Sequence, residues 1–181
     1  MDPVFEKLNP VPAVERPDLM AESTFQALEL IPQAQVFEID PELSETESVC
    51  QTFDLPHDIM GNAVLVMGKR EGEVRQCCCM SLANRRVDVN GFVRKQLNVR
   101  KASFAPMELA VESSGMEYGA ITPVGLSSDW PVWIDESLRD VPWLIVGSGV
   151  RHGKLIVPGA SLLNLPGVQL MEGLTSPVSV D

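Results

Sequence analysis

The stretch GMEYGAITPVG, residues 115–125, decides how the second half of the chain is interpreted. It places three glycines and a proline between an expected helix, residues 103–114, and a short apolar strand around residues 132–134. Gly115 is well placed to end that helix in the left-handed conformation that glycine adopts most easily. Two interpretations are open from the local sequence: a helix cap followed by a tight turn, or a backbone shaped to hold a ligand.

Elements of both kinds alternate on either side of this loop. Apolar residues at helical spacing predict a helix over residues 21–30, and Ser44 with Glu47 has the spacing of a capping box that starts another. Residues 62–82 predict a β-hairpin whose turn is KREGE, and Asn90 is expected to cap a short helix. Further strands are expected at 34–40, 143–149, 154–159 and 168–174. The pattern predicts an α/β (α+β) fold with a mixed sheet, in one domain over residues 19–181 after an irregular arm, 1–18.

The charge of the chain limits the classes of partner. Its 181 residues carry a net charge of -11, which argues against sequence-blind binding of nucleic-acid backbone over a broad surface. A local basic patch remains open, because most lysines and arginines lie between residues 69 and 101. No apolar run approaches the ~20 residues that span a bilayer, and the N-terminus lacks the pattern of a secretory signal. We therefore expect a cytoplasmic protein without a membrane partner.

Three of the four cysteines are consecutive, Cys77, Cys78 and Cys79, in a segment that reads as a strand. Successive side chains of a strand point to opposite faces, so Cys77 and Cys79 should share one face and Cys78 the other. Such a run lacks the spacing of a metal site. We expect buried, reduced thiols that pack as small apolar groups; a reactive thiol is the alternative.

Three blocks of the sequence, in this order, resemble the YbaK/EbsC family, the single-domain relatives of the editing domain inserted in bacterial prolyl-tRNA synthetase. The blocks are KASFAPMELAVESSGMEYGAITPVGL (101–126), VWIDESL (132–138) and VGSGVRHGKLIVPGASLLNL (146–165). The resemblance implies a mixed, barrel-like sheet flanked by helices. It also implies hydrolysis of the ester that joins a wrong amino acid to the 3′ end of a tRNA, with a synthetase as a further partner. It implies neither a metal nor a cofactor.

The resemblance also suggests roles for individual residues. Backbone N–H groups near Gly119 would stabilise the negative oxygen that forms when water attacks an ester, and Thr122 offers a hydroxyl. Glycine lets backbone approach a ligand closely, and Pro123 would hold the loop in shape. The remaining predicted contacts to substrate or tRNA are Gly115, Gly125, Lys101, Asp135, Gly147, Ser148 and Gly149. Each has a plainer alternative: a solvated surface lysine for Lys101, a turn or helix cap for Asp135, and a simple hairpin turn for residues 147–149.

One position departs from the family pattern. The family has a lysine at the start of the strand that follows its second helix, where this chain has Asn62. An amide donates and accepts hydrogen bonds but cannot neutralise an oxyanion or a phosphate as an ammonium does. Either ester hydrolysis persists with Asn62 as an uncharged orienting group, or the chain binds an aminoacyl or nucleotide-like ligand, or a synthetase, without efficient catalysis. Asn62 could also simply satisfy backbone groups at the strand start.

Overall fold

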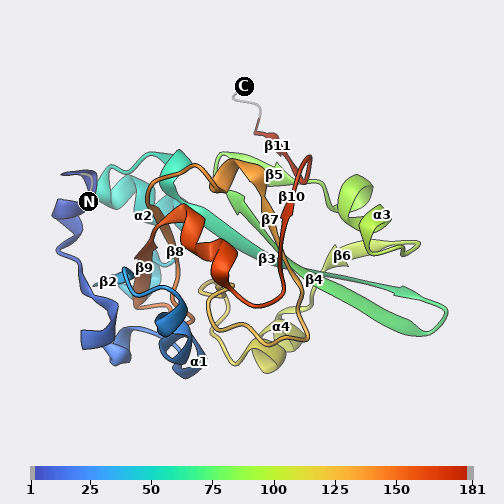
Figure 1. The fold of residues 1–181 in the computed structure, drawn as a ribbon, viewed down its shortest axis with the longest axis horizontal. Coiled ribbons are helices and arrows are strands. Elements are labelled where there is room, and N and C mark those ends of the chain that lie inside the picture. Colours follow the sequence, from blue (N-terminus) through green and yellow to red (C-terminus); the bar gives the residue numbers. More distant parts are fainter. Residues whose placement is uncertain (1–2, 179–181) are drawn as a thin grey trace.

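A computed structural model describes residues 3–178 of the protein, and two sheets form its centre (Figure 1). One sheet has the strand order β1-β2-β9-β8, the other β10-β7-β4-β3-β6, and a two-stranded ribbon pairs β11 with β5. The strands are β1 (Val11–Pro12), β2 (Gln35–Glu38), β3 (Gly61–Arg70), β4 (Glu73–Leu82), β5 (Arg85–Val87), β6 (Ala102–Phe104), β7 (Val132–Asp135), β8 (Leu144–Gly147), β9 (Gly153–Val157), β10 (Val168–Met171) and β11 (Thr175–Pro177). Parallel and antiparallel pairs both occur, so the predicted mixed α+β class is confirmed.

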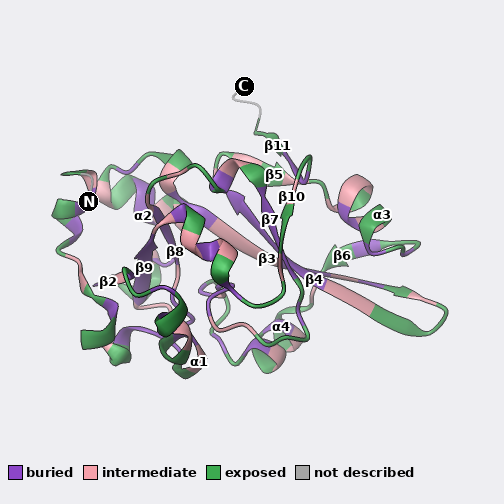
Figure 2. Ribbon diagram, viewed as in Figure 1, coloured by how far each residue is buried: buried purple, intermediate pink, exposed green. Residues whose placement is uncertain are grey.

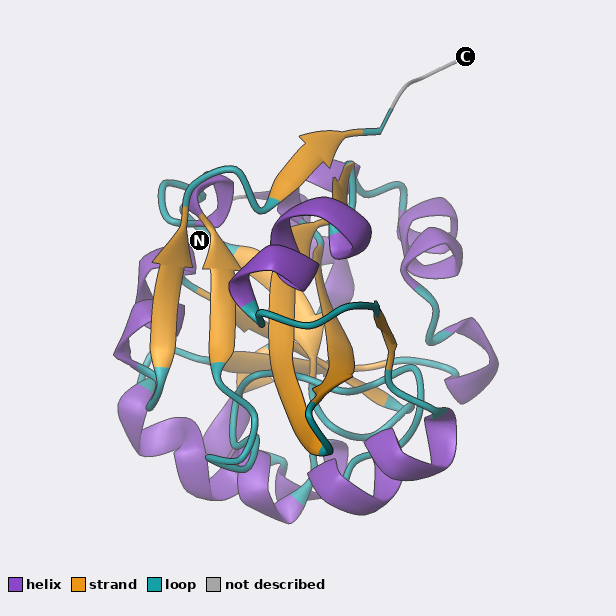
Figure 3. Ribbon diagram, turned by 90° about the vertical axis from the view of Figure 1, so that its right-hand side faces the viewer, coloured by secondary structure: helices purple, strands orange, loops and turns teal. Residues whose placement is uncertain are grey.

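Helices surround the sheets (Figure 3). The α-helices are α1 (Glu22–Gln26), α2 (Thr46–Phe53), α3 (Arg94–Gln96) and α4 (Met107–Ser114). The 3-10 helices are η1 (Pro3–Leu8), η2 (Ala13–Glu15), η3 (Pro17–Leu19), η4 (Ala27–Leu30), η5 (Pro41–Leu43), η6 (His57–Ile59), η8 (Glu136–Leu138) and η9 (Gly159–Asn164), and η7 (Val89–Val93) is a π-helix turn. None of the helices within residues 3–178 has the length and apolar character that crossing a bilayer requires.

The long hairpin of β3 and β4 supplies two of the inner strands of the larger sheet. Its two strands pair antiparallel from Gly61–Leu82 to Arg70–Glu73, as the sequence predicted. Glu71 and Gly72 form the turn with φ angles of 53° and 86°, the left-handed pair that two-residue hairpin turns require. The hairpin tip projects away from the body of the molecule, and its residues are largely exposed (Figure 2).

The two sheets meet where β3 begins. Met60, the residue before β3, forms a parallel bridge with Ile145 of β8, and β8 pairs antiparallel with β9. This contact places the start of β3 beside the β8–β9 hairpin and opposite the loop that follows α4. The point where the sheets meet therefore gathers the three segments that the sequence singled out.

Two predicted helix starts are wrong. Glu45, not Ser44, occupies the N-cap of α2, and the Ser44 hydroxyl is buried without a hydrogen-bond partner among the described residues. The 3-10 turn η5 ends at Leu43 and has Ser44 as its C-cap, which takes that residue out of the N-cap position of α2. Asp88, not Asn90, caps the π-helix turn by accepting hydrogen bonds from the N–H groups of Gly91 and Phe92. A carboxylate with two acceptor oxygens satisfies both donors at once.

The core explains the cysteine run. Cys78 packs in the cluster between the two sheets, whereas Cys77 and Cys79 face a separate cluster under α3 and β6, so the predicted alternation is confirmed. All four cysteines are free and buried. The N-terminal turns add Phe5 and Leu8 to a third cluster, together with α2 and β9 residues; the division of the chain at residue 18 stays a prediction.

Candidate functional site

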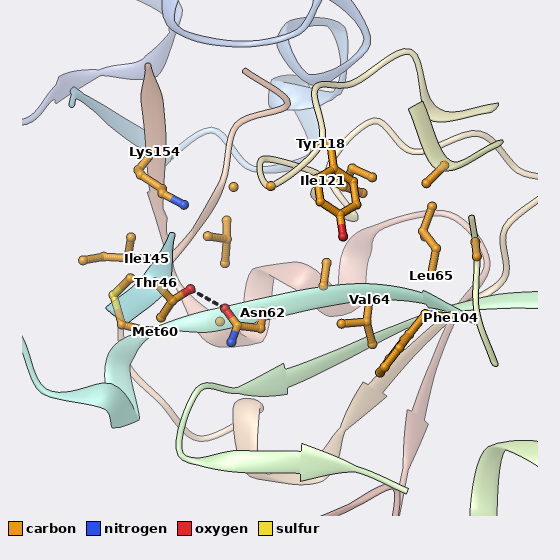
Figure 4. A pocket seen from close by; sticks show the side chains of 17 residues that line it. Thr46, Met60, Asn62, Val64, Leu65, Phe104, Tyr118, Ile121, Ile145 and Lys154 are labelled. Carbon is orange, nitrogen blue, oxygen red and sulfur yellow. Dashed lines mark hydrogen bonds between the residues drawn. The ribbon is translucent and has the colours of Figure 1, made fainter. Parts of the chain in front are cut away.

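A cavity of about 390 Å³ lies where the two sheets meet (Figure 4). This volume falls in the range of ligand pockets, roughly 300–1,000 Å³. The start of β3, the strands β8 and β9, the end of β6, and the loop after α4 supply its walls. Its lining residues are Thr46, Met60, Gly61, Asn62, Ala63, Val64, Leu65, Phe104, Ala105, Ala110, Tyr118, Gly119, Ile121, Ile145, Val146, Gly147 and Lys154. Three predicted site residues, Asn62, Gly119 and Gly147, are among them.

The two glycine-rich segments lie against one another. The N–H of Gly149 donates to the carbonyl of Ala120 at 2.9 Å, and the N–H of Glu117 donates to the carbonyl of Gly149 at 2.9 Å. A Cβ at Gly147 would lie 2.5 Å from the Ala120 carbonyl oxygen, so only glycine lets the two segments approach this closely. The loop of residues 115–125 and the turn of 147–149 therefore form one wall of the cavity.

Asn62 faces the cavity from the second position of β3 and is held by a neighbour. The Thr46 hydroxyl, at the start of α2, donates to Asn62 Oδ1 at 2.6 Å. That bond occupies the amide oxygen and leaves the Asn62 NH₂ group, for which the described residues offer no partner, to donate to a ligand. At the opposite wall the Gly119 peptide, whose φ is 85°, also makes no hydrogen bond within the described chain.

Sequence reasoning missed Lys154. Its side chain extends from β9 into the cavity (Figure 4) and is only 5% exposed. It is the single charged side chain among the described residues that line the cavity. Burial lowers the pKa of the Lys154 ammonium to about 8, although the nearby Cys50 acts in the opposite direction. The signal that could have revealed it is strand alternation, since Lys154 shares a strand face with the buried Ile156.

Two aromatic residues at the cavity mouth were also missed. Phe104, at the end of β6, is 62% exposed, and Tyr118, in the glycine-rich loop, is 56% exposed. Both lie across the cavity from Lys154 (Figure 4). Large exposed aromatic side chains beside a cavity are typical of contact surfaces for ligands. The cavity thus runs from a buried end, at Lys154 and Ile145, to an aromatic mouth.

The other predicted residues lie outside the cavity lining. Thr122, Pro123 and Ser148 are buried within the two segments, and Thr122 Oγ1 accepts from the N–H of Val124 at 3.4 Å. Gly125, with a φ of 80°, packs against the backbone of α1, and Gly149 joins the two segments as described. These residues shape the wall of the cavity from behind rather than forming its surface.

Gly115, Asp135 and Lys101 have separate positions. Gly115 ends α4 in the left-handed conformation with a φ of 67°, which is the predicted cap. Asp135 is 1% exposed and caps η8 by accepting from the N–H of Ser137 at 3.2 Å. Its carboxylate also lies 3.5 Å from Arg85 Nε, so the helix-cap alternative describes its contacts. Lys101 is exposed and immediately precedes β6, the strand that ends at Phe104.

The site is built for an elongated ligand with an electron-rich group at its inner part. The inner walls are apolar, from Met60, Ile121, Ile145 and Val146. The lining residues supply three hydrogen-bond donors without a partner among the described residues, namely the Lys154 ammonium, the Asn62 amide and the Gly119 peptide N–H. Hydrogen bonds of this kind stabilise a developing oxyanion. Among residues 3–178 no group of three or more His, Cys, Asp or Glu side chains is arranged to hold a metal ion.

A mixed α+β fold with a cavity walled on one side by two glycine-rich segments is the arrangement of a small ligand-binding or hydrolytic domain. Residues 40–165 match the family described as the aminoacyl-tRNA editing domain. The match covers more than half of the chain, and the chain belongs to this family. This agrees with the resemblance to YbaK that the three sequence blocks carry.

Solved structures share the fold at low sequence identity. A candidate trans-editing enzyme for prolyl-tRNA synthetase is 18% identical with a TM-score of 0.67, over 95% of this chain and 97% of that chain. The hypothetical protein APE2540 is 13% identical with a TM-score of 0.73, over 86% of this chain and 100% of that one. A scaffold from work on computational epitope grafting is 20% identical with a TM-score of 0.70, over 84% and 95%. No curated protein matches the sequence.

Proposed function

We propose that this protein hydrolyses the ester bond of a mischarged aminoacyl-tRNA and does so in the cavity between the two sheets. Membership of the aminoacyl-tRNA editing domain family supports the reaction class. The single observation that carries the proposal is the cavity itself, which joins a buried end with hydrogen-bond donors to an open aromatic mouth. An aminoacyl-adenosine has the matching order of groups: amino acid, ester, then nucleoside.

The orientation of the substrate follows from burial. The amino acid enters first and lies against Met60, Ile145 and Val146, whose apolar walls suit a small apolar side chain. The ester then lies between Lys154, Asn62 and the Gly119 peptide, which supply the hydrogen-bond donors of the described lining. The terminal adenine stays at the mouth and stacks on Phe104 or Tyr118, a contact worth ~1–3 kcal/mol per base.

The rest of the tRNA leaves the mouth along β6. Arg100 and Lys101 precede this strand and are exposed. The register of β3 with β6 pairs Gly68 with Ala102, which places Lys69 beside the same strand end. Phosphate contacts from a few lysines and arginines position a nucleic acid without reading its sequence. A local basic strip reconciles tRNA binding with a net charge of -11.

A deacylation assay over a panel of charged tRNAs tests the proposal. The panel begins with tRNAPro carrying noncognate amino acids, because the similar structure is described as serving prolyl-tRNA synthetase. Release of labelled amino acid above the spontaneous rate for at least one member is the expected result. No release from any member would refute hydrolysis, and tight binding without release would favour the non-catalytic binding module.

Variants at the mouth connect the activity to this cavity. Phe104→Ala and Tyr118→Ala should each raise KM at least about fivefold, from the loss of ~1 kcal/mol or more of stacking. Leu170→Ala removes an exposed apolar side chain of β10 that lies outside the cavity lining and serves as the control. If the Leu170 variant and both mouth variants behave alike, the activity does not reside in this cavity.

A further inference from the structure

Lys154 is a buried charged side chain with no partner. It is 5% exposed, and its ammonium makes no hydrogen bond or ion pair with any described residue. Lysine is almost never this buried unless it is paired. The ionisable group that affects it is the Cys50 thiol of α2, which burial keeps neutral by raising the thiol pKa. The folded protein therefore contains an uncompensated positive charge at the inner end of its cavity.

The fold gains nothing from this charge. Lys154 pairs with Gly147 of β8 and Phe37 of β2 through the sheet register alone, which any non-proline residue can provide. Its neighbours in the adjacent core cluster are apolar, including Phe37, Ile145 and Met60. A methionine would fill similar space without the cost of removing an ammonium from water. Retention of a destabilising charged group in a cavity is typical of functional sites.

The position of Lys154 relative to Asn62 indicates what the charge serves. Both residues line the same cavity, from β9 and from the start of β3 (Figure 4). The Asn62 side chain is neutral and its oxygen is already occupied by Thr46. Among the described lining residues, only Lys154 can therefore place a full positive charge next to a group that binds between these two strands.

We propose that Lys154 is a catalytic residue that donates a hydrogen bond to the carbonyl oxygen of the aminoacyl ester and stabilises the oxyanion formed from it. This inference rests on the proposed function. Water attacks the carbonyl carbon, and the C–O bond to the ribose then breaks. The proton lost by the water ends on the ribose oxygen, and the amino acid leaves with a free carboxyl group. Lys154 stays protonated throughout, so it supplies charge and takes no proton.

Exchange of the charge between the two strands tests this proposal. Lys154→Met removes the ammonium, and the double variant N62K/K154M returns one from the opposite strand. Lys154→Met should lower kcat/KM about 100-fold or more, as the loss of an oxyanion donor does, for every aminoacyl group that the wild type hydrolyses. The double variant should recover at least about tenfold of that loss. Lys95→Met, an exposed lysine of α3 outside the cavity lining, should stay within about twofold of wild type.

Three outcomes would overturn the proposal. Lys154→Met could keep activity within a few-fold of wild type, which would leave ester hydrolysis in this protein but remove Lys154 from it. The loss could be confined to one aminoacyl group, which would assign the ammonium to recognition of that side chain. A wild type that deacylates no tRNA would remove both this inference and the proposed function. Circular dichroism of each variant shows that a lost activity is not a lost fold.

Discussion

Replacing Lys154 by methionine should make the protein more stable while it impairs the proposed reaction. Lys154 is only 5% exposed, and no described group pairs with its ammonium. Methionine has similar length and no charge to desolvate. The surrounding residues, Phe37, Ile145 and Met60, already form an apolar cluster that would accept a thioether.

The size of the effect follows from the pKa of Lys154. Burial lowers it from 10.5 to about 8. Between pH 8 and 10.5 the unfolded chain binds this proton and the folded chain does not, so the free energy of unfolding rises with pH across that window. Below pH 8 the full penalty applies. A difference of about 2.5 pKa units corresponds to ~3 kcal/mol, so the methionine variant should be about 3 kcal/mol more stable at pH 7.

Urea unfolding at a series of pH values measures the prediction. The difference in unfolding free energy between Lys154→Met and wild type should fall from ~3 kcal/mol at pH 7 towards zero near pH 10.5. Groups common to both proteins cancel in this difference, and the facing ionisable group is Cys50, whose thiol is kept reduced in the assay. At this chain length the same difference corresponds to ~6–12 °C in Tm. Lys95→Met serves as the control and should show no such pH dependence.

A stability difference that is constant with pH would refute the reasoning, because it would mean that Lys154 has the same pKa in the folded and unfolded chains. A methionine variant that is less stable at pH 7 would refute it as well. That result would mean that the ammonium has a stabilising partner in solution, and the argument for a catalytic role from the missing partner would then fail.

Three further predictions concern residues around the site. Gly125→Ala should lower the free energy of unfolding by about 3 kcal/mol or more, because its φ is 80° and a Cβ would lie 2.2 Å from the backbone of α1. Gly115→Ala, at a φ of 67° with open space around it, should lower it by only ~1–2 kcal/mol. Equal losses in urea unfolding would contradict this prediction. Asp135→Ala should cost about 2 kcal/mol by removing a buried cap and the partner of an arginine. Asp140→Ala removes one partner of an exposed ion pair and should lower the free energy of unfolding by less than ~0.5 kcal/mol. Equal losses for Asp135→Ala and Asp140→Ala would contradict the stabilising role of the buried Asp135 carboxylate. The cysteines of residues 77–79 should resist iodoacetamide at pH 8 until the protein unfolds, because all three are buried. The contact with the Cys79 thiol and burial also raise the pKa of Cys77, and burial raises the pKa of Cys78. Labelling of the native protein would contradict their burial.

Local patterns predicted much of the fold. The β3–β4 hairpin, the helix that ends at Gly115 and the alternation of the cysteines depend on turn chemistry and strand periodicity, which neighbouring residues determine. The two wrong helix caps also depend on neighbouring residues. Ser44 and Asn90 have suitable side chains, but an intervening 3-10 turn and a competing carboxylate at Asp88 changed which residue sits at the helix start. Such competition among neighbouring caps is not visible in residue spacing.

The cavity could be predicted only in part. Asn62, Gly119 and Gly147 were identified as site residues through the resemblance to the YbaK/EbsC family, and the structure brings all three to one cavity. The mouth residues Phe104 and Tyr118 were missed because exposure of a single aromatic residue depends on what packs over it. Their role depends on how β6 and the loop after α4 converge, which is a property of the tertiary fold.

Lys154 shows why the burial of a charged side chain is difficult to predict from the sequence. In the segment GKLIV a lysine near a strand start is expected to be solvated. It is buried because α2 residues pack against β9, which also lies between β2 and β8 in the sheet. The same packing makes the Lys154 ammonium destabilising, because burying an unpaired ammonium lowers the stability of the folded protein. The lost free energy is regained only when an electron-rich group enters the cavity. A charge on an oxygen that exists only as the ester reacts would be stabilised more than the neutral ground state. The destabilising position of Lys154 and its proposed contribution to the rate are therefore one physical effect, and a variant that lowers one should lower the other.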